Sequence, residues 1–340
     1  MRQPRIDGGA GVGVPRVSVV IPSYNTGRFI ARAIESVVET GYPELEILVV
    51  EDGSTDDSLK RLAGMGAIRL LTHPGNRNRG IAASRNLGIC EATGKYVAFL
   101  DADDAFLKNR FDTCIPMMEA DSAIEAVVEP FYYDYVSGER AREMSGAGQG
   151  AEQRRSSVEG NATTQSPPGM FMDLLEGRNL PHTSSITIRK KIFRETGLFP
   201  PLKFCPEPPL WLRLFSRECV KAGSREPVSV YALHEDSTCA QHEKSAAFVF
   251  DYIAALMDAH RWMRRHEIKA DYVAAIEQQA FGKFYHYCAG VTARPHSFWR
   301  DNVGAAARFA ATFPEALKTA KFWKVAIRLI GAEVGLVKWK

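Results

Sequence analysis

Four short apolar runs in the first hundred residues have the length and the apolar content of β-strands: 17–21, 45–50, 67–72 and 96–100. Between them, apolar residues recur at helical spacing in 29–38 and in 81–93. These two stretches end near Gly41 and at Gly94, and glycine commonly follows the last turn of a helix. The pattern therefore predicts strands that alternate with helices.

One further helix is predicted after the second apolar run, where Ser54 and Asp57 form a capping-box pattern. Near-continuous apolar strands that alternate with helices are typical of a parallel sheet whose two faces are both covered. We therefore predict a doubly wound, mainly parallel α/β unit over residues 1–105.

The rest of the chain changes character twice. Residues 138–168 are rich in Gly, Ser, Gln, Glu and Arg and contain almost no large apolar side chains, which predicts a mobile or disordered insert. From Lys244 onward, apolar residues return at helical spacing, and no β pattern interrupts them. We expect an all-helical C-terminal region.

The overall charge does not indicate a nucleic-acid partner. The 340 residues include 43 Lys and Arg and 40 Asp and Glu, a formal net charge of only +3. The six cysteines form no CxxC pair and the N-terminus lacks an apolar signal core, which predicts reduced thiols and a cytoplasmic location. No apolar run approaches the ~20 residues of a membrane-spanning helix, so membrane contact is expected to be peripheral.

Polar and acidic side chains directly follow three of the predicted strands. Ligands of an open parallel sheet bind outside the carboxyl ends of its strands, so we expect these side chains, five carboxylates among them, to meet in one crevice. Each cluster taken alone could instead supply only helix caps or turn residues. The clusters are Pro22-Ser23-Tyr24-Asn25, Glu51-Asp52 and Asp101-Ala102-Asp103-Asp104.

Carboxylates that crowd together predict a cation. Like charges about 4 Å apart repel by roughly 1 to 4 kcal/mol at effective dielectric constants of about 80 to 20. Hard oxygen ligands without clustered Cys or His favour Mg²⁺ or Mn²⁺, which commonly join one or two carboxylates to a substrate diphosphate. No GxxxxGK[ST] loop is present, which argues against a P-loop phosphotransferase.

Three ordered segments resemble the consecutive motifs of the family 2 inverting glycosyltransferases, which have the GT-A fold. The resemblance is strong over residues 16–110 and weaker over 180–240. It implies a doubly wound, mainly parallel, Rossmann-like α/β fold that binds a nucleotide sugar. The segments are VSVVIPSYNTGRFIARAIESV, ILVVEDGSTDDSL and NRGIAASRNLGICEATGKYVAFLDADD.

The same resemblance implies roles for individual residues. Asp103 would ligate a Mg²⁺ or Mn²⁺ ion that bridges the donor diphosphate, and Asp101 would face the ribose or the metal. The basic residue of the donor site would be Arg85, for which the alternative is a solvated or salt-bridged helix arginine. The residues implied at the nucleotide sugar are Pro22, Tyr24, Asn25, Glu51, Asp52, Arg85, Asp101 and Ala102.

The acceptor-side motif departs from the family pattern. Before Leu210-Trp211 the family carries Glu-Asp, whereas this chain reads CPEPP over 205–209. Aligned without a gap, Glu207 takes the place of the catalytic Asp. We predict that Glu207 is extended, that Pro208 opens the following helix, and that Glu207 is the catalytic base. The alternative is a solvated residue in a proline-rich turn.

Residues 230–237 resemble the Tyr-Arg-x-His ending of the family, with Ala232 where arginine is usual. By this resemblance His234 is a further metal or diphosphate ligand, and the alternative is an ordinary surface or core histidine.

The expected activity is transfer of a sugar, with inversion, from a nucleotide diphosphate sugar to an unknown acceptor. The family favours a UDP-sugar as donor and a glycan, lipid-linked or other acceptor. One alternative is a non-catalytic nucleotide-sugar-binding or scaffold protein that has lost its base. The other is a nucleotidyltransferase, which would need a Gly-rich phosphate loop after the first strand.

These assignments predict how the chain divides into domains. We expect a loose segment at 1–15, a GT-A domain at 16–240 and a helical region at 241–340. Within the GT-A domain we expect a nucleotide-sugar half at 16–110, a mobile insert at 138–168 and an acceptor half at 169–240.

The end of the chain carries a basic pattern of its own. Residues 316–340 hold six basic side chains and one acid, Glu333, interleaved with apolar residues. A basic amphipathic helix can lie on an anionic membrane, which would place the protein at the inner face of that membrane. The alternative is a helix packed on its own domain.

Overall fold

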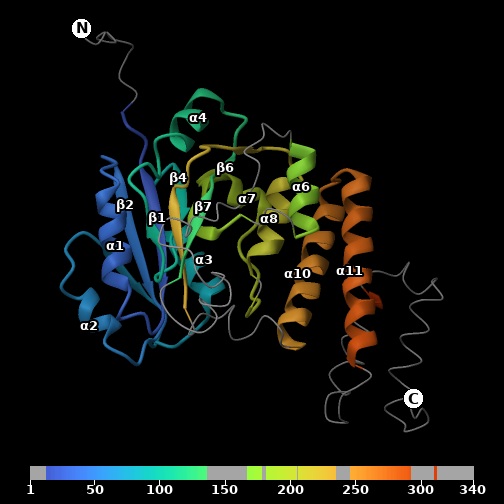
Figure 1. Ribbon diagram of the computed structural model, residues 1–340, viewed down its shortest axis with the longest axis horizontal. Helices are drawn as coiled ribbons and strands as arrows, with labels where there is room; N and C mark the ends of the chain where they lie inside the picture. Colours follow the sequence, from blue (N-terminus) through green and yellow to red (C-terminus); the bar gives the residue numbers. More distant parts are fainter. Residues whose placement is uncertain are drawn as a thin grey trace, which may run out of the picture.

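A seven-stranded sheet forms the centre of the structure (Figure 1). The computed structural model describes residues 13–135, 167–177, 181–204, 206–234, 246–291 and 310–311. The strand order is β3-β2-β1-β4-β8-β6-β9. In that order the strands are Arg69–Thr72, Leu45–Glu51, Val17–Ser23, Tyr96–Phe99, Ile186–Arg189, Ala126–Val128 and Val220–Ala222.

Most neighbouring strands in this sheet are parallel. Strands β1 to β4 all run the same way, and β6 pairs in parallel with β9. Strand β8 is the exception, because it runs antiparallel both to β4 and to β6. The predicted doubly wound, mainly parallel sheet is confirmed, and β8 adds one reversed strand between β4 and β6.

Two hydrophobic clusters cover the two faces of the sheet, because successive side chains of a strand point to opposite faces. In β1, Val19 belongs to one cluster with α1 and α4, and Val20 belongs to the other with α3. These helices, together with the short α2, connect the strands. Helices α1 to α4 are Ile30–Glu39, Ser58–Leu62, Ile81–Glu91 and Cys114–Ala120.

Two local predictions in this half are wrong. No helix begins at Ser54, because α2 starts at Ser58, and its preceding residue Asp57 makes no side-chain cap. The Ser54 hydroxyl instead accepts the backbone N–H of Asn25, which ties the loop after β2 to the loop after β1. Val38, the last residue of the helical pattern at 29–38, which predicts one apolar face, is 51% exposed, because the buried stripe of α1 ends at Val37.

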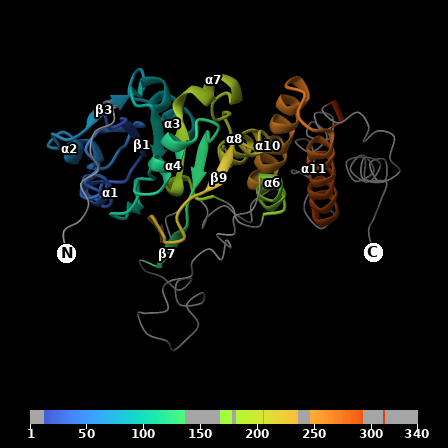
Figure 2. The same ribbon diagram turned by 90° about the horizontal axis from the view of Figure 1, so that it is seen from above.

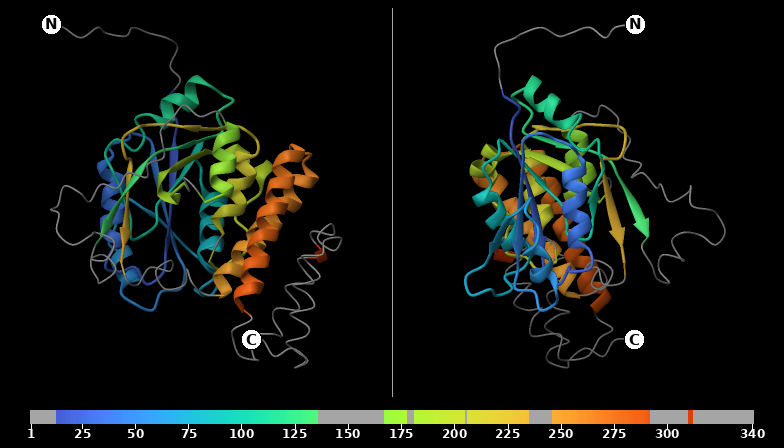
Figure 3. Two further views of the ribbon diagram at one scale, coloured as in Figure 1. Left: turned by 45° about the vertical axis from the view of Figure 1, so that its right-hand side comes forward. Right: turned by 90° about the vertical axis from the view of Figure 1, so that its left-hand side faces the viewer.

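A second sheet of three strands lies beside the first. It has the order β5-β10-β7, and β10 pairs antiparallel with β5 and parallel with β7. The arrows of β7 and β10 run side by side in the right-hand view of Figure 3. The strands β5, β7 and β10 are Ala105–Phe106, Phe131–Tyr135 and Ser229–Leu233.

The later helices stand at one end of the sheet (Figure 2). Helices α8, α10 and α11 pack in sequence, and their apolar side chains belong to the same cluster as β1, β4 and α3. The all-helical prediction is confirmed for the described residues after 245. The helices α6, α7, α8, α10 and α11 are Pro167–Leu175, Phe193–Thr196, Glu207–Phe215, Ala246–Arg265 and Ala270–Val291.

Some predicted segments lie outside the described residues. These are most of the loose segment at 1–15, the insert at 138–168 apart from the first two residues of α6, and the basic helix at 316–340. Within the described part of the chain, none of the helices combines the length and the apolarity needed to cross a bilayer.

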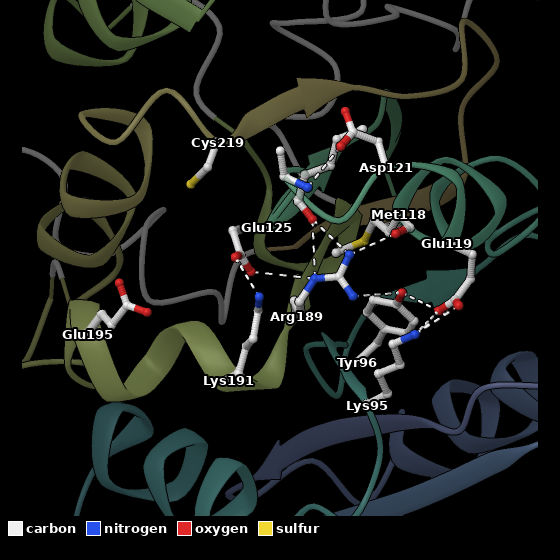
Figure 4. Close-up of polar contacts among 12 residues, drawn as sticks. Lys95, Tyr96, Met118, Glu119, Asp121, Glu125, Arg189, Lys191, Glu195 and Cys219 are labelled. Atoms are coloured by element: carbon white, nitrogen blue, oxygen red, sulfur yellow. Dashed lines mark hydrogen bonds and ion pairs between the residues drawn. The ribbon is translucent and has the colours of Figure 1, made fainter.

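Polar contacts join β4, β8 and α4 at the amino end of β4 (Figure 4). Arg189, at the end of β8, donates from Nη2 to the carbonyl oxygens of Met118 at 2.7 Å and of Ile124 at 3.1 Å. Its Nη1 donates to the Tyr96 hydroxyl at 3.2 Å, and that hydroxyl donates in turn to Glu119. This network holds the reversed strand in register on the side away from the acidic cluster that follows β4.

Candidate active site

The loops after β1 and β2 are tied together. Asn25 adopts a positive φ of 53°, a conformation that asparagine tolerates better than most residues. Its Oδ1 accepts the backbone N–H of Thr55 at 2.8 Å, and its own N–H donates to the Ser54 hydroxyl at 2.9 Å. Tyr24, just before it, is 46% exposed, whereas Pro22 is buried inside β1. An exposed aromatic ring thus stands at the carboxyl end of β1.

The two acids after β2 are bound by backbone N–H groups. Glu51 is fully buried, and its two oxygens accept from Ser54 at 2.6 Å and from Gly53 at 3.0 Å. Asp52 accepts from the N–H groups of Arg79 at 2.6 Å and Gly80 at 2.8 Å. Both carboxylates therefore shape the loops at the carboxyl end of β2, and Asp52 holds the start of α3.

The acids after β4 have side-chain partners instead. Arg85 Nη2 donates to Asp101 Oδ1 at 2.7 Å, and His234 Nε2 lies 2.9 Å from Asp103 Oδ2. Asp104 is buried, accepting the Ser184 hydroxyl at 2.6 Å. Its other oxygen accepts a backbone N–H of β10 at 3.0 Å. These side-chain partners reduce the repulsion between the carboxylates that the sequence predicted.

Burial sets the protonation of two groups behind this cluster. Burial raises the pKa of Asp104 well above its ordinary value, and the nearby charges of Asp103 and Asp101 raise it further. Burial also lowers the pKa of His182 to about 4. The His182 ring stacks on Tyr231 with a centroid distance of 4.3 Å, which encloses it on one side. His182 is therefore neutral at pH 7.

The environment of His234 fixes its tautomer. Arg28 Nη2 lies 3.4 Å from His234 Nδ1, and an arginine can only donate. Nδ1 therefore accepts, and Nε2 carries the proton that points to Asp103. The ring also lies 4.8 Å from the Phe29 ring, which limits its movement. The predicted metal residues Asp103 and His234 are thus in direct contact.

Two sets of side chains could hold a cation. One is the predicted pair Asp103 and His234. The other is Asp101, Asp104 and His182, whose ligand atoms all lie within 4.8 Å of one another. In the second set both oxygens of Asp104 already accept hydrogen bonds, and Asp101 already pairs with arginine. In the first set His234 already contacts both Asp103 and Arg28, so an ion there would have to displace a hydrogen bond as well; carboxylate and imidazole ligands suit Mg²⁺ or Mn²⁺.

Glu207 lies in the same cluster as the acids after β4, although it comes from the far half of the chain. Arg85 Nη1 donates to a Glu207 oxygen while Nη2 holds Asp101. Arg85 is only 1% exposed. Burial alone would lower the pKa of Arg85, but Asp101 and Glu207 outweigh burial and raise it. Arg85 is therefore not a solvated helix arginine. It is a buried arginine in ion pairs with Asp101 and Glu207.

One detail of the Glu207 prediction is wrong. Glu207 is the first residue of α8 and not an extended residue before it, and Pro206 is the N-cap. Proline is tolerated in the first turn because the first N–H groups of a helix have no intrahelical partner, so Pro208 and Pro209 fit inside the helix. The predicted position of Glu207 at a helix N-terminus is confirmed.

Three neighbours of the cluster were not predicted as site residues: Arg28, His182 and Ser184. His182 and Ser184 precede the reversed strand β8, whose start lies beside the end of β4 because the two strands are antiparallel. The polar run HTSS before the apolar ITI was visible in the sequence, but the direction of β8 was not. Ala102, predicted at the nucleotide sugar, is 3% exposed and packs in the apolar cluster.

Comparison with known proteins gives a consistent result. A family model described as "Glycosyl transferase family 2" matches residues 18–191, about half of the chain. An uncharacterized glycosyltransferase of Rickettsia felis is 41% identical over 109 residues, which are 32% of this chain and 18% of that relative. The chain matches well under half of the length of such curated relatives.

Two solved structures are similar in fold. The crystal structure of S. aureus TarS 1–349 in complex with UDP-GlcNAc has a TM-score of 0.57 and 16% identity, over 94% of this chain and 88% of that one. The mannosyltransferase PcManGT from Pyrobaculum calidifontis, in complex with GDP-Man and Mn²⁺, has a TM-score of 0.51 and 18% identity, over 98% and 90%. Both likenesses support the GT-A fold.

Proposed function

The chain belongs to glycosyl transferase family 2, and we propose that it moves a sugar from a nucleoside diphosphate donor to an acceptor hydroxyl with inversion at the anomeric carbon. The observation that carries this proposal is the meeting of Asp101, Arg85 and Glu207. It joins the expected donor side of the site to the expected base, which lies 122 residues after Arg85 in the sequence.

The donor is proposed to bind across the carboxyl ends of β1, β2 and β4. The exposed ring of Tyr24 can stack on the nucleobase, and Asn25 and Asp52 hold the loops that would surround it. Of the two similar structures, TarS contains UDP-GlcNAc and PcManGT contains GDP-Man, so the fold alone does not select the base. We propose a UDP-sugar because the family motifs favour it.

A divalent ion fits beside the donor diphosphate. Asp103 and His234 would hold Mg²⁺ or Mn²⁺ once His234 Nε2 gives up the proton that it directs to Asp103. When bound, such an ion stabilises the negative charge of the departing diphosphate. The similar structure of PcManGT contains Mn²⁺, which supports a metal of this kind.

Glu207 is the proposed base. As the acceptor oxygen attacks the anomeric carbon, Glu207 takes the hydroxyl proton, the bond from the anomeric carbon to the diphosphate oxygen breaks, and the nucleoside diphosphate leaves with the electron pair. Attack opposite the leaving group inverts the anomeric centre.

A donor panel tests the proposal. The protein is incubated with UDP- and GDP-sugars and Mn²⁺ or Mg²⁺, and release of nucleoside diphosphate is measured with water as the acceptor. We expect release from a UDP-sugar, and we expect Glu207→Gln to lower turnover by about 100-fold or more while leaving UDP affinity unchanged. Transfer at the wild-type rate by Glu207→Gln would show that another residue is the base.

The same panel separates catalysis from simple binding. Binding of UDP without release of diphosphate from any sugar nucleotide would instead favour a non-catalytic nucleotide-sugar-binding protein. Proton NMR of the anomeric centre in the product distinguishes inversion from retention.

A further inference from the structure

Arg85 joins two carboxylates that come from different halves of the chain. It lies in the middle of α3 and reaches Asp101 after β4 through Nη2 and Glu207 at the start of α8 through Nη1. Its side chain is only 1% exposed, whereas the side chains of the two acids are each 23% exposed. A buried arginine that holds two acids with separate nitrogens fixes the position of both.

These contacts leave Arg85 poorly suited to bind a diphosphate. One positive charge already faces two negative charges, so the net charge of this group of three is −1. Burial removes the screening that would weaken those interactions. The remaining donor, Nε, is buried and has no hydrogen-bond partner among the described residues. A second anion at this place would meet net negative charge.

Glu207 needs a partner of this kind because its own helix offers few donors. A carboxylate at a helix N-terminus is usually held by the free N–H groups of the first turn. In α8 the next two residues are Pro208 and Pro209, which have no N–H. The prolines fix the backbone, but they leave the Glu207 side chain without these local donors. Among the described contacts of Glu207, Arg85 supplies the donor.

A second contact from α3 holds the segment that leads to α8. Asn86, the neighbour of Arg85, donates from Nδ2 to the Phe199 carbonyl at 2.8 Å and accepts the Phe199 N–H on Oδ1 at 3.0 Å. The Arg85 guanidinium also lies 5.5 Å from the centroid of the Phe199 ring. Helix α3 therefore holds both the segment before the base and the base itself.

We propose that Arg85 is a positioning residue that holds the Glu207 carboxylate at a fixed place relative to Asp101. The inference rests on the proposed function, in which Glu207 is the base and Asp101 lies at the donor. Fixing a free Glu side chain during the reaction would cost conformational entropy. Arg85 fixes it beforehand, so the acceptor hydroxyl meets an oriented base.

The test is a double-mutant cycle between Arg85→Lys and Glu207→Gln. Lysine keeps the charge but cannot hold two carboxylates with a planar fork. We expect Arg85→Lys to lower kcat for diphosphate release by about 10- to 100-fold, with the nucleotide sugar that the donor panel identifies. The dissociation constant for UDP, measured by calorimetry, should stay within about threefold of wild type. In the Glu207→Gln background, Arg85→Lys should change kcat less than about twofold.

Arg213→Lys is the matched control for damage to α8. Arg213 is a buried arginine of the same helix, and it binds the Thr196 carbonyl at 2.8 Å and Asp258 rather than Glu207. Its loss should therefore have the same fractional effect on kcat in both backgrounds. Circular dichroism melting of each variant confirms that the chains compared are folded.

The outcomes separate the two proposals. Glu207→Gln at the wild-type rate overturns the assignment of the base and this inference with it. The other case is a slow Glu207→Gln, as expected for loss of the base. If Arg85→Lys then lowers kcat by the same factor in the Glu207→Gln background as in wild type, the inference alone is overturned. A loss of UDP affinity of tenfold or more in Arg85→Lys also overturns it, because that result assigns Arg85 to the donor diphosphate.

Discussion

At the scale of single residues, each acid after β4 has a different partner and therefore a different role. Asp101 pairs with Arg85, Asp103 with His234, and Asp104 with a hydroxyl and a backbone N–H. Asp103 lies 2.9 Å from its histidine, whereas His182 lies 3.5 Å from Asp104, whose oxygens already accept two hydrogen bonds. The prediction of metal dependence therefore concerns Asp103.

Asp103→Ala should abolish detectable transfer and weaken UDP binding by about 100-fold when Mn²⁺ is present, because the diphosphate charge loses its metal link. In EDTA the wild type and the variant should bind UDP equally. Calorimetric titration with UDP in both buffers measures this, and Asp112→Ala, an exposed acid, is the control. Undiminished transfer by wild type in EDTA would contradict the prediction.

Glu119 should contribute to stability in a pH-dependent way. Hydrogen bonds from Lys95, at 2.6 and 2.8 Å, and from Tyr96 lower the pKa of Glu119. A carboxyl with a lower pKa in the folded state stabilises the fold above its unfolded value of about 4.5, and this contribution is lost as the pH falls through the folded value. Glu119 is 29% exposed, so screening limits the effect to about 1 kcal/mol.

In urea unfolding, Glu119→Gln should therefore lower the free energy of unfolding by about 1 kcal/mol at pH 7 and by less at pH 4. Glu44→Gln, which removes an ion pair between exposed side chains, is the control and should change little at either pH. An equal loss for Glu119→Gln at both pH values would show that its charge is not what stabilises the fold.

The residue types of the site could be predicted from the sequence, but their contacts could not. The position of Asp101 and Asp103 after an apolar strand was enough to place them at the ligand edge of a parallel sheet. The pairing of Arg85 with Glu207 depends on the packing of α8 against the sheet, for which no local pattern exists. His182 was missed for the same reason, because its place depends on the direction of β8.

At the scale of elements, α3 approaches β1 unusually closely. A Cβ built on Gly88 would lie 2.3 Å from Val20 Cγ1 and 2.9 Å from its Cγ2. Only glycine allows this distance, so the position of the helix that carries Arg85 depends on Gly88. In contrast, a Cβ at Gly282 in α11 would meet no atom of the described residues within 4 Å.

Gly88→Ala should lower the free energy of unfolding by about 1 to 3 kcal/mol, because the added methyl group forces α3 away from β1. Gly282→Ala, a substitution of the same kind in open space, should raise it by up to about 1 kcal/mol, because alanine favours the helix. Chemical denaturation measures both. A higher free energy of unfolding for Gly88→Ala would contradict the prediction, because it would mean that α3 can move away from β1 without loss of stability.

Long, periodic elements were predicted well, and short ones were not. The strands of the first half and helices α1 and α3 agree with the predictions to within about two residues. Burial imposes the apolar pattern of β1, β2, β4 and the two helices, whereas β3 is mostly exposed. Strands β5 and β9, of two and three residues, are too short to show a period. They form through pairing with distant strands, which the sequence does not state.

At the scale of the whole molecule, the helices after residue 245 and the sheet share one hydrophobic cluster. Asp251 of α10 also accepts the N–H groups of Lys203 and Phe204 at 2.8 Å each, just before the helix of Glu207. The predicted domain boundary at residue 240 remains a prediction. The sequence pattern changes there, but the segments on both sides contribute side chains to one hydrophobic cluster.

We therefore expect a chain that ends at residue 240 to lose cooperative unfolding, because the cluster loses α10 and α11. A chain that ends after Pro314 keeps both helices and should melt like the full chain. Differential scanning calorimetry compares the three. A normal transition in the chain that ends at residue 240 would show that the first part folds alone.

The truncation after Pro314 also tests the predicted membrane contact of 316–340. Flotation with anionic vesicles should recover the full chain and leave the truncated one behind, because six basic side chains are lost. Equal flotation of both would reject the contact.

The reversed strand β8 has a consequence for the nascent chain. Strand β4 ends at Phe99, and its neighbour β8 begins only at Ile186. At about 5 to 20 residues per second, the ribosome needs roughly 4 to 17 seconds to make the residues in between. During that time the parallel half of the sheet can form while β4 stays an open edge with unpaired backbone groups, the kind of surface to which other chains add. Newly made protein is thus most exposed to aggregation, and most in need of a chaperone, in the interval before β8 leaves the ribosome.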